Sequence, residues 1–205
     1  MIKVTRVPAP ADFDEKVKVP GMVFLRPFLD ADAKPTSTEW KNHDYWKHAR
    51  PALREAFNCR CAYLAMREIG DGEVDHFESK SDEPAKAYDW NNYRFANGEV
   101  NKKKSKSDQV LDPFLVEANW FRVDLVSGKV VATDHIPVEY RTRAEETITR
   151  LGLNKKSYRD TRLCYSIGCF ERAPTNEHLE LIADLAPLVA QAIRELWDGS
   201  TEVRR

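Results

Sequence analysis

An aspartate directly followed by a histidine is the first place in this sequence where the residue types suggest chemistry. Asp75 and His76 are adjacent, Asn92 follows His76 by sixteen residues, and Asn101 follows Asn92 by nine. Hydrolysis of a phosphodiester bond needs a base that takes a proton from water and hard oxygen ligands that hold a divalent cation. Histidine titrates near neutral pH, and carboxylate and amide oxygens suit Mg²⁺ or Mn²⁺. These positions could therefore supply a metal-dependent hydrolytic site.

The spacing of the set matters more than any one member. Asp-His pairs occur often in turns and surface networks, where they are structural, and a single asparagine is ordinary. Neighbours within a strand point to opposite sides, so Asp75 and His76 can serve one site only near a strand end, where the following turn reorients them. The joint spacing of Asp75-His76, Asn92, Asn101 and Lys104 favours a functional interpretation over the structural one.

The spacing resembles that of the HNH endonucleases, in particular a bacterial branch that includes the nuclease subunits of the Septu antiphage system and of some retrons. The resemblance covers roughly residues 54–114. The matching segments are Cys61-Ala62-Tyr63-Leu64, Asp75-His76-Phe77-Glu78-Ser79-Lys80, Asn92-Tyr93, Asn97-Gly98-Glu99-Val100-Asn101-Lys102-Lys103-Lys104 and Leu111-Asp112-Pro113-Phe114.

This resemblance implies a ββα-metal finger and an endonuclease activity. By the same resemblance, His76 would be the general base and Asn92 would hold the His76 loop in position. Asp75 and Asn101 would ligate Mg²⁺ or Mn²⁺. Such a site leaves coordination positions for water and for phosphate oxygens.

The zinc ligands of similar proteins are mostly missing. Of the four cysteine positions only Cys61 remains, because Leu64, Asn97 and Val100 occupy the other three. One thiolate cannot build a tetrahedral site, so structural zinc is not expected and packing has to replace it, for instance between Leu64 and Val100. A zinc site built from Cys59, Cys61 and a distant histidine stays open as the less favoured alternative.

Several lysines lie close to the motif in the sequence and are candidates for binding nucleic acid. Each lysine that neutralises a phosphate releases a counterion, which strengthens binding and makes it salt-sensitive. The alternative is that they are solvated side chains on a loop. The candidates are Lys80, Lys102, Lys103 and Lys104, with Lys106 in the same run.

The composition limits the remaining possibilities. With 32 basic and 33 acidic residues the formal net charge is −1, so any attraction of nucleic acid must be local. No segment has the length and apolarity of a secretion signal or a membrane span, and four cysteines do not make a disulfide framework. We therefore expect a cytoplasmic protein with reduced thiols and no membrane partner.

We expect the α+β class, with the ββα-metal core embedded in helices and followed by an extra hairpin and a helical C-terminal region. Capping-box patterns begin at Thr36 and Thr142, and glycines at 70, 72 and 128 indicate hairpins. The expected organisation is a single compact unit: an extended, proline-rich arm over 1–35, a nuclease core over 36–114, and a packed hairpin and helical region over 115–205.

Two function classes follow from these observations. The first is an endonuclease acting on DNA in preference to RNA, with an ATPase partner and a role in antiphage defence implied only by the resemblance. The second is an inactive scaffold that binds nucleic acid or a partner protein through its C-terminal helices. A zinc-binding module ranks last because its ligands are missing.

Overall fold

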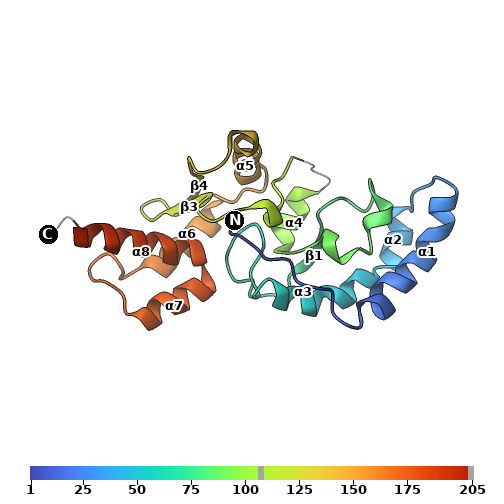
Figure 1. Ribbon diagram of the computed structural model, residues 1–205, viewed down its shortest axis with the longest axis horizontal. Coiled ribbons are helices and arrows are strands. Elements are labelled where there is room, and N and C mark those ends of the chain that lie inside the picture. The colour runs from blue at the N-terminus through green and yellow to red at the C-terminus, as the bar shows by residue number, and fades with distance from the viewer. Residues whose placement is uncertain (106–108, 203–205) are drawn as a thin grey trace. The chain divides into compact units, whose positions relative to one another are not determined.

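The chain has an α+β fold that divides into two compact units. The computed structural model describes residues 1–105 and 109–202, with side chains to residue 198. These residues form eight α-helices and two antiparallel sheets of two strands each (Figure 1). Unit 1 comprises residues 1–4, 62–67 and 109–205, and unit 2 comprises 5–61 and 68–108. The single compact unit expected from the sequence is therefore replaced by two units that share the chain discontinuously.

The N-terminal part of unit 2 is helical, which corrects the extended arm predicted over 1–35. A short π-helical segment, Asp14–Lys18, leads into α1, Val19–Asp30. Pro20 directly follows the π-helical segment in the first turn of α1, and Pro27 lies inside the helix. Burial of the apolar face, including Leu25, stabilises the helix despite these prolines.

The capping box predicted at Thr36 is confirmed. The Thr36 side chain accepts a hydrogen bond from the Glu39 amide, and the Glu39 carboxylate accepts one from the Thr36 amide, which begins α2, Ser37–Asn42. The chain then continues through a 3₁₀ helix, Tyr45–Ala49, into α3, Arg50–Ala56. Pro51 lies in the first turn of α3, so it helps to begin this helix.

A two-stranded sheet and the helix that follows it lie at the centre of unit 2. β1, Glu73–His76, pairs antiparallel with β2, Tyr93–Ala96, so that Asp75 is opposite Arg94 and His76 is opposite Tyr93. Strand β2 leads into α4, Gly98–Lys104, and both α3 and α4 contact β1. Short 3₁₀ helices, Pro84–Lys86 and Trp90–Asn92, lie between the strands.

The hairpin predicted around Gly70-Asp71-Gly72 does not form. Residues 63–69 are not in a strand, and β1 pairs with β2 instead. Gly72 has a φ of +64°, and a Cβ there would lie 2.3 Å from the Phe95 ring. The turn into β1 therefore requires glycine, because only glycine adopts this left-handed conformation readily and leaves room for the ring.

Asn97 and Val100, which stand where similar proteins have zinc-binding cysteines, have structural roles in α4. The Asn97 side chain accepts hydrogen bonds from the amides of Glu99 and Val100 at 3.1 and 3.3 Å and so caps the helix. Its Nδ2 donates to Glu68 Oε2 at 2.8 Å, and Val100 is completely buried. Capping and apolar burial therefore fix the beginning of this helix.

Unit 1 contains the second sheet and the C-terminal helices. The hairpin predicted around Gly128 is confirmed as β3, Phe121–Asp124, and β4, Lys129–Ala132. The capping box predicted at Thr142 is wrong, because α5 already begins four residues earlier after Pro137, whose fixed φ suits a helix start. The remaining elements are a 3₁₀ helix, Pro113–Leu115, and the helices α5, Val138–Arg150; α6, Lys156–Ser166; α7, Asn176–Leu185; and α8, Pro187–Glu202.

The helices of the described ranges, 1–105 and 109–202, include none with the length and apolarity to cross a membrane.

A substitution at Gly21 tests how closely α1 packs on the rest of unit 2. A Cβ at this position would lie 2.2 Å from Cγ of the Tyr88 ring. Gly21→Ala would gain about 1 kcal/mol of helix propensity in an open helix. Here we expect the clash to exceed that gain and to lower the free energy of unfolding by about 1–3 kcal/mol. Urea unfolding measures the change, and Gly70→Ala is the control. Equal stability of the two variants would contradict the close packing of α1 on Tyr88.

Candidate functional site

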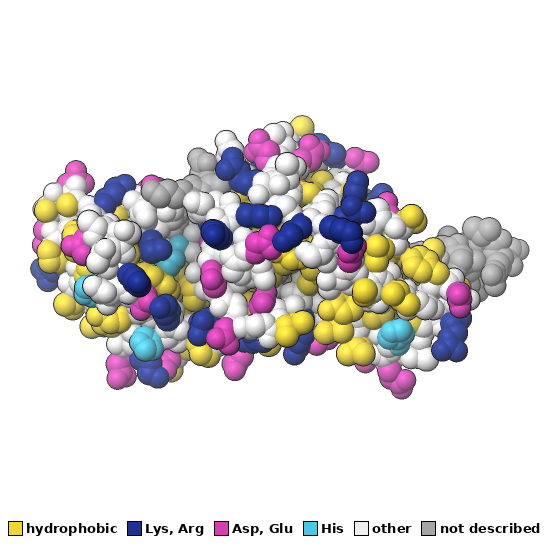
Figure 2. All heavy atoms as spheres, turned by 180° about the vertical axis from the view of Figure 1, so that it is seen from behind, with side chains coloured by type: hydrophobic (Ala, Val, Ile, Leu, Met, Phe, Trp, Pro, Cys, Tyr) yellow, Lys and Arg dark blue, Asp and Glu magenta, His cyan; other side chains and the backbone are white. Residues whose placement is uncertain are grey.

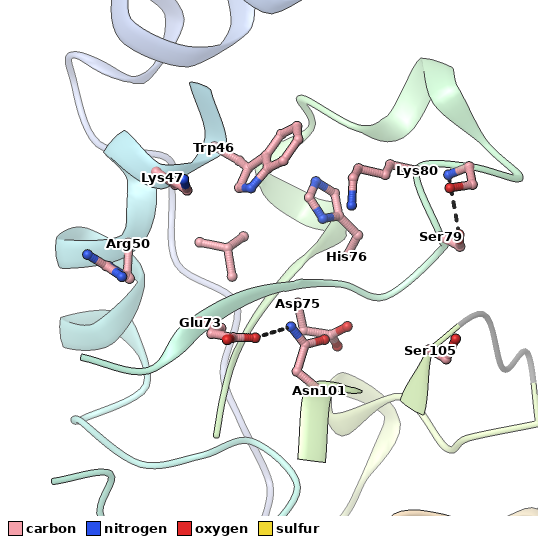
Figure 3. Close-up of a pocket in the computed structure, with 12 residues that line it drawn as sticks. Trp46, Lys47, Arg50, Glu73, Asp75, His76, Ser79, Lys80, Asn101 and Ser105 are labelled. Atoms are coloured by element: carbon pink, nitrogen blue, oxygen red, sulfur yellow. Dashed lines mark hydrogen bonds between the residues drawn. The ribbon is translucent and has the colours of Figure 1, made fainter. Parts of the chain in front are cut away.

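A cavity of about 490 Å³ in unit 2 is the candidate site. Its walls come from β1, the Tyr45–Ala49 turn, the start of α3, the loop after β1 and one face of α4 (Figure 3). The lining residues are Trp46, Lys47, Arg50, Glu73, Val74, Asp75, His76, Ser79, Lys80, Ser81, Asn101 and Ser105.

The structure brings four of the predicted site residues to this cavity. Asp75 and His76 reach it from the end of β1, Lys80 from the following loop, and Asn101 from α4. In Figure 3 the His76 ring lies between the Trp46 ring and the Lys80 side chain. Asp75 and His76 are neighbours whose side chains would point to opposite faces within a strand. Both line the same cavity because β1 ends at His76.

The tautomer of His76 follows from its hydrogen bond. The ring Nε2 lies 2.9 Å from the carbonyl oxygen of Ala87, and because a carbonyl only accepts, Nε2 must carry the proton. The neutral ring therefore has its lone pair on Nδ1. The rings of Trp46 and Tyr93 pack edge-to-face against His76, with centroids at 4.9 and 5.2 Å, and fix its orientation.

The surroundings keep His76 neutral. Burial is the main cause that lowers its pKa from 6.5 to about 3, and the positive charges of Lys80 and Lys104 lower it further, while the bond to Ala87 opposes them. The ring is therefore unprotonated throughout the physiological range and can accept a proton at Nδ1. Burial also lowers the pKa of Lys80, an effect that the charge of Asp75 partly offsets.

Asn92 lies behind the cavity and holds the loop that follows His76. Its Oδ1 accepts from the Glu78 amide at 2.8 Å, and its Nδ2 donates to the carbonyls of Glu78 and Lys86 at 2.9 and 3.0 Å. Its own carbonyl accepts from the Phe77 amide at 2.8 Å. Asn92 thus fixes both ends of the segment that carries Lys80, and it does not line the cavity itself.

Lys104 is positioned differently from the sequence prediction, which placed it on nucleic acid. Its side chain is only 1% exposed, and Nζ donates three hydrogen bonds of 2.9 Å to Asp75 Oδ1 and to the carbonyls of His76 and Phe77. An ammonium group has three donors, so all are used within the protein. Lys104 is therefore an internal support of the strand end, and contact with a phosphate is excluded by its burial.

Asn101 and Asp75 present oxygen donors of the kind that Mg²⁺ prefers. Asn101 Nδ2 donates to Glu73 Oε2 at 2.7 Å, which directs the amide oxygen away from Glu73. The described parts of the chain contain no group of three or more His, Cys, Asp or Glu placed to hold a metal. Magnesium commonly uses one or two protein oxygens and keeps several waters, so Asp75 and Asn101 fit such an ion chemically.

Three cations line the cavity, two of which the sequence did not suggest. Lys47 and Arg50 lie on successive turns next to Trp46, and Lys80 faces them from the loop after β1. Lys47 pairs with Asp44, and an Arg50 nitrogen lies 3.8 Å from an Asp71 oxygen. The three-residue spacing of Lys47 and Arg50 is the signal in the sequence that could have indicated them.

The lysine run of α4 mostly faces elsewhere. Lys102 and Lys103 are exposed and do not line the cavity, and Lys103 Nζ lies 3.4 Å from Glu99 Oε1. Lys106 lies outside the described residues. Glu73, Trp46 and Ser105 are cavity residues that the spacing argument missed, because none belongs to the matched pattern.

No family model matches the chain, and no curated protein shows significant similarity to it.

Replacing Lys104 with methionine tests its role as a support. Lys104→Met keeps much of the side-chain length but leaves the buried Asp75 carboxylate without its ammonium partner. We expect a loss of about 3–5 kcal/mol in the free energy of unfolding, measured with urea. The exposed Lys103→Met is the matched control and should change stability by less than about 0.5 kcal/mol. Equal effects of the two substitutions would refute the role.

The pH dependence of stability tests the burial of His76. Its pKa is about 3 in the folded chain against 6.5 when exposed, so the unfolded state binds the proton more readily. Stability is therefore lost as the pH falls below about 6.5, by up to about 1.4 kcal/mol per pH unit from this group. His76→Gln should lose less stability than wild type between pH 7 and pH 4.5 in urea unfolding.

The matched control for this measurement is His178→Gln, because His178 is exposed on α7. Its pH profile should follow that of wild type. If the His76→Gln profile also ran parallel to wild type, the ring would not be held neutral by its surroundings.

Proposed function

We propose that the chain is a metal-dependent endonuclease that hydrolyses phosphodiester bonds of nucleic acid. One observation carries the proposal: His76, with its lone pair on Nδ1, lines the same cavity as two hard oxygen donors and three cations. General bases, oxygen ligands and cations are the groups that phosphodiester hydrolysis requires. The resemblance of the Asp75-His76, Asn92 and Asn101 spacing to HNH endonucleases supports the same activity.

His76 acts as the general base in this proposal. Nδ1 accepts a proton from the attacking water, and the Ala87 carbonyl, which holds Nε2–H, stabilises the imidazolium that forms. The negative phosphodiester and the hydroxide-like character of the attacking water both favour the protonated ring. They therefore offset the low pKa that burial and the nearby lysines impose on the ring without substrate.

Asp75 and Asn101 would hold Mg²⁺ or Mn²⁺, which supplies Lewis-acid stabilisation of the leaving oxygen. Glu73 orients the Asn101 amide, and Lys104 orients the Asp75 carboxylate. Lys80, Lys47 and Arg50 neutralise phosphate charge, so binding should be strongest at low salt. Asn92 acts at a distance by fixing the loop that carries Lys80.

The finer parts of the proposal rest on the resemblance. They are DNA as the preferred substrate, an ATPase partner and a role in antiphage defence. Partner binding is also supported by apolar side chains on the surface of unit 1. Ile167, Phe170, Leu181 and Leu196 are each more than 40% exposed, and Figure 2 shows hydrophobic side chains gathered near the C-terminal end of the chain.

A scaffold without catalysis is the second candidate function. It is favoured by the Lys104–Asp75 ion pair, which already neutralises the carboxylate that would hold the metal. A scaffold of this kind would bind nucleic acid with or without divalent cations.

Cleavage assays with purified protein distinguish the two candidates. We expect plasmid DNA to be nicked and cut with Mg²⁺ or Mn²⁺ and to stay intact with chelator, with structured RNA as the parallel substrate. His76→Ala should lower the rate by about 10²- to 10⁴-fold because the proton acceptor is lost. Asp75→Asn and Asn101→Ala should raise the Mg²⁺ concentration needed for half-maximal cleavage.

The control is His135→Ala, which removes an exposed histidine of unit 1 and should cleave as wild type. Equal cleavage by His76→Ala and wild type would exclude His76 as the base. Binding without cleavage under every metal condition would favour the scaffold.

A further inference from the structure

A second cavity of about 300 Å³ adjoins the candidate active site within unit 2. The two cavities share Trp46, Lys80 and Ser81, so the wall between them is formed by these three side chains. The second cavity is further lined by Pro35, Ser37, Trp40, Lys41 and Asp44. A ligand that extends past Lys80 would therefore occupy both cavities.

The indole of Trp40 lines the second cavity with atoms other than its nitrogen. Its side chain is only 4% exposed, and its indole Nε1 is buried without a hydrogen-bond partner in the described part of the chain. A buried donor left unpaired costs about 1–3 kcal/mol, and the great majority of such donors find a partner. Nε1 has almost no accessible surface, so a ligand in the cavity would contact the apolar ring and not this donor.

The same cavity has aromatic walls and a polar rim. The rings of Trp40 and Trp46 lie 6.0 Å apart between centroids, and Lys80 Nζ lies 5.1 Å from the centre of the Trp46 ring. Ser37 and Lys41 are exposed at its edge. Flat apolar surface with a cation at the boundary suits a planar ring that is attached to an anion.

We infer that the second cavity binds the nucleotide next to the scissile phosphate. Its base lies against the tryptophan rings, while Lys80 contacts the phosphate between the two cavities. A base inside a duplex is stacked and paired, and freeing it costs a few kcal/mol. The preferred substrate class is therefore unpaired, single-stranded nucleic acid. This inference rests on the proposed function and adds a specificity pocket to it.

The substrate class is tested by cleavage of a mixed-sequence 12-nucleotide strand, as DNA and as RNA, free and annealed to its complement. Wild type should cleave the free strand at least about tenfold faster than the duplex, since pairing withholds the base from the cavity. Equal rates on the free strand and the duplex would overturn the inference while leaving the proposed nuclease intact.

The role of Trp40 is tested by combining a variant with a substrate that lacks bases. Trp40→Phe keeps the wall apolar but replaces the indole with a smaller ring, so lost stacking should lower kcat/KM on the normal DNA strand by about three- to tenfold. On an abasic strand of equal length Trp40→Phe and wild type should be equal. A loss of the same size on both strands would mean that Trp40 acts only through packing. Lys103→Ala, outside both cavities, is the matched control.

A binding measurement separates this inference from the proposed catalysis. His76→Ala, with and without Trp40→Phe, is titrated with fluorescein-labelled free strand, duplex and abasic strand in chelator. Tighter binding of the free strand, reduced by Trp40→Phe, supports the cavity even if wild type cleaves nothing. Equal affinity for all three probes overturns the inference, whatever the outcome of the cleavage assay.

Discussion

The ion pair between Lys104 and Asp75 is the interaction on which the rest of the site depends. It joins the last residue of α4 to the end of β1, and the two further bonds of the ammonium group hold the carbonyls of His76 and Phe77. A buried pair of this kind adds little net stability over an apolar core, but removing one partner is costly. Its value here is geometric, because it fixes the strand end from which both Asp75 and His76 reach the cavity.

The histidine is built into the protein more rigidly than an exposed base would be. Two aromatic edges, a carbonyl on Nε2 and the loop held by Asn92 leave the ring one orientation. The same burial that orients the ring makes it a weak base without substrate. The negative charge of the substrate therefore has to raise the pKa of the ring. In the free protein the orientation of the ring is already fixed, but its basicity is not yet suited to catalysis.

Three residues predicted from their spacing, Asp75, His76 and Asn101, line the candidate cavity. Lys47 and Arg50 line it too, but they come from the Tyr45–Ala49 turn and the start of α3, which no short pattern connects to the others. Lys104 was misread because charge in a sequence does not reveal burial. In the fold, Thr36 and Gly128 gave correct local signals, since capping and turn chemistry act within a few residues. The α1 helix was missed because its prolines are offset by tertiary packing.

The division of the chain between its two units has a consequence for dissecting the protein. The polypeptide passes from one unit to the other after residues 4, 61, 67 and 108. Neither unit is therefore a contiguous gene fragment, and a single proteolytic nick at any one of these points would leave the units covalently joined. Unit 1 also combines residues 1–4 with residues that follow unit 2 in the sequence, as in the bond from Lys3 to Glu117, so during synthesis it can be completed only after unit 2 has emerged.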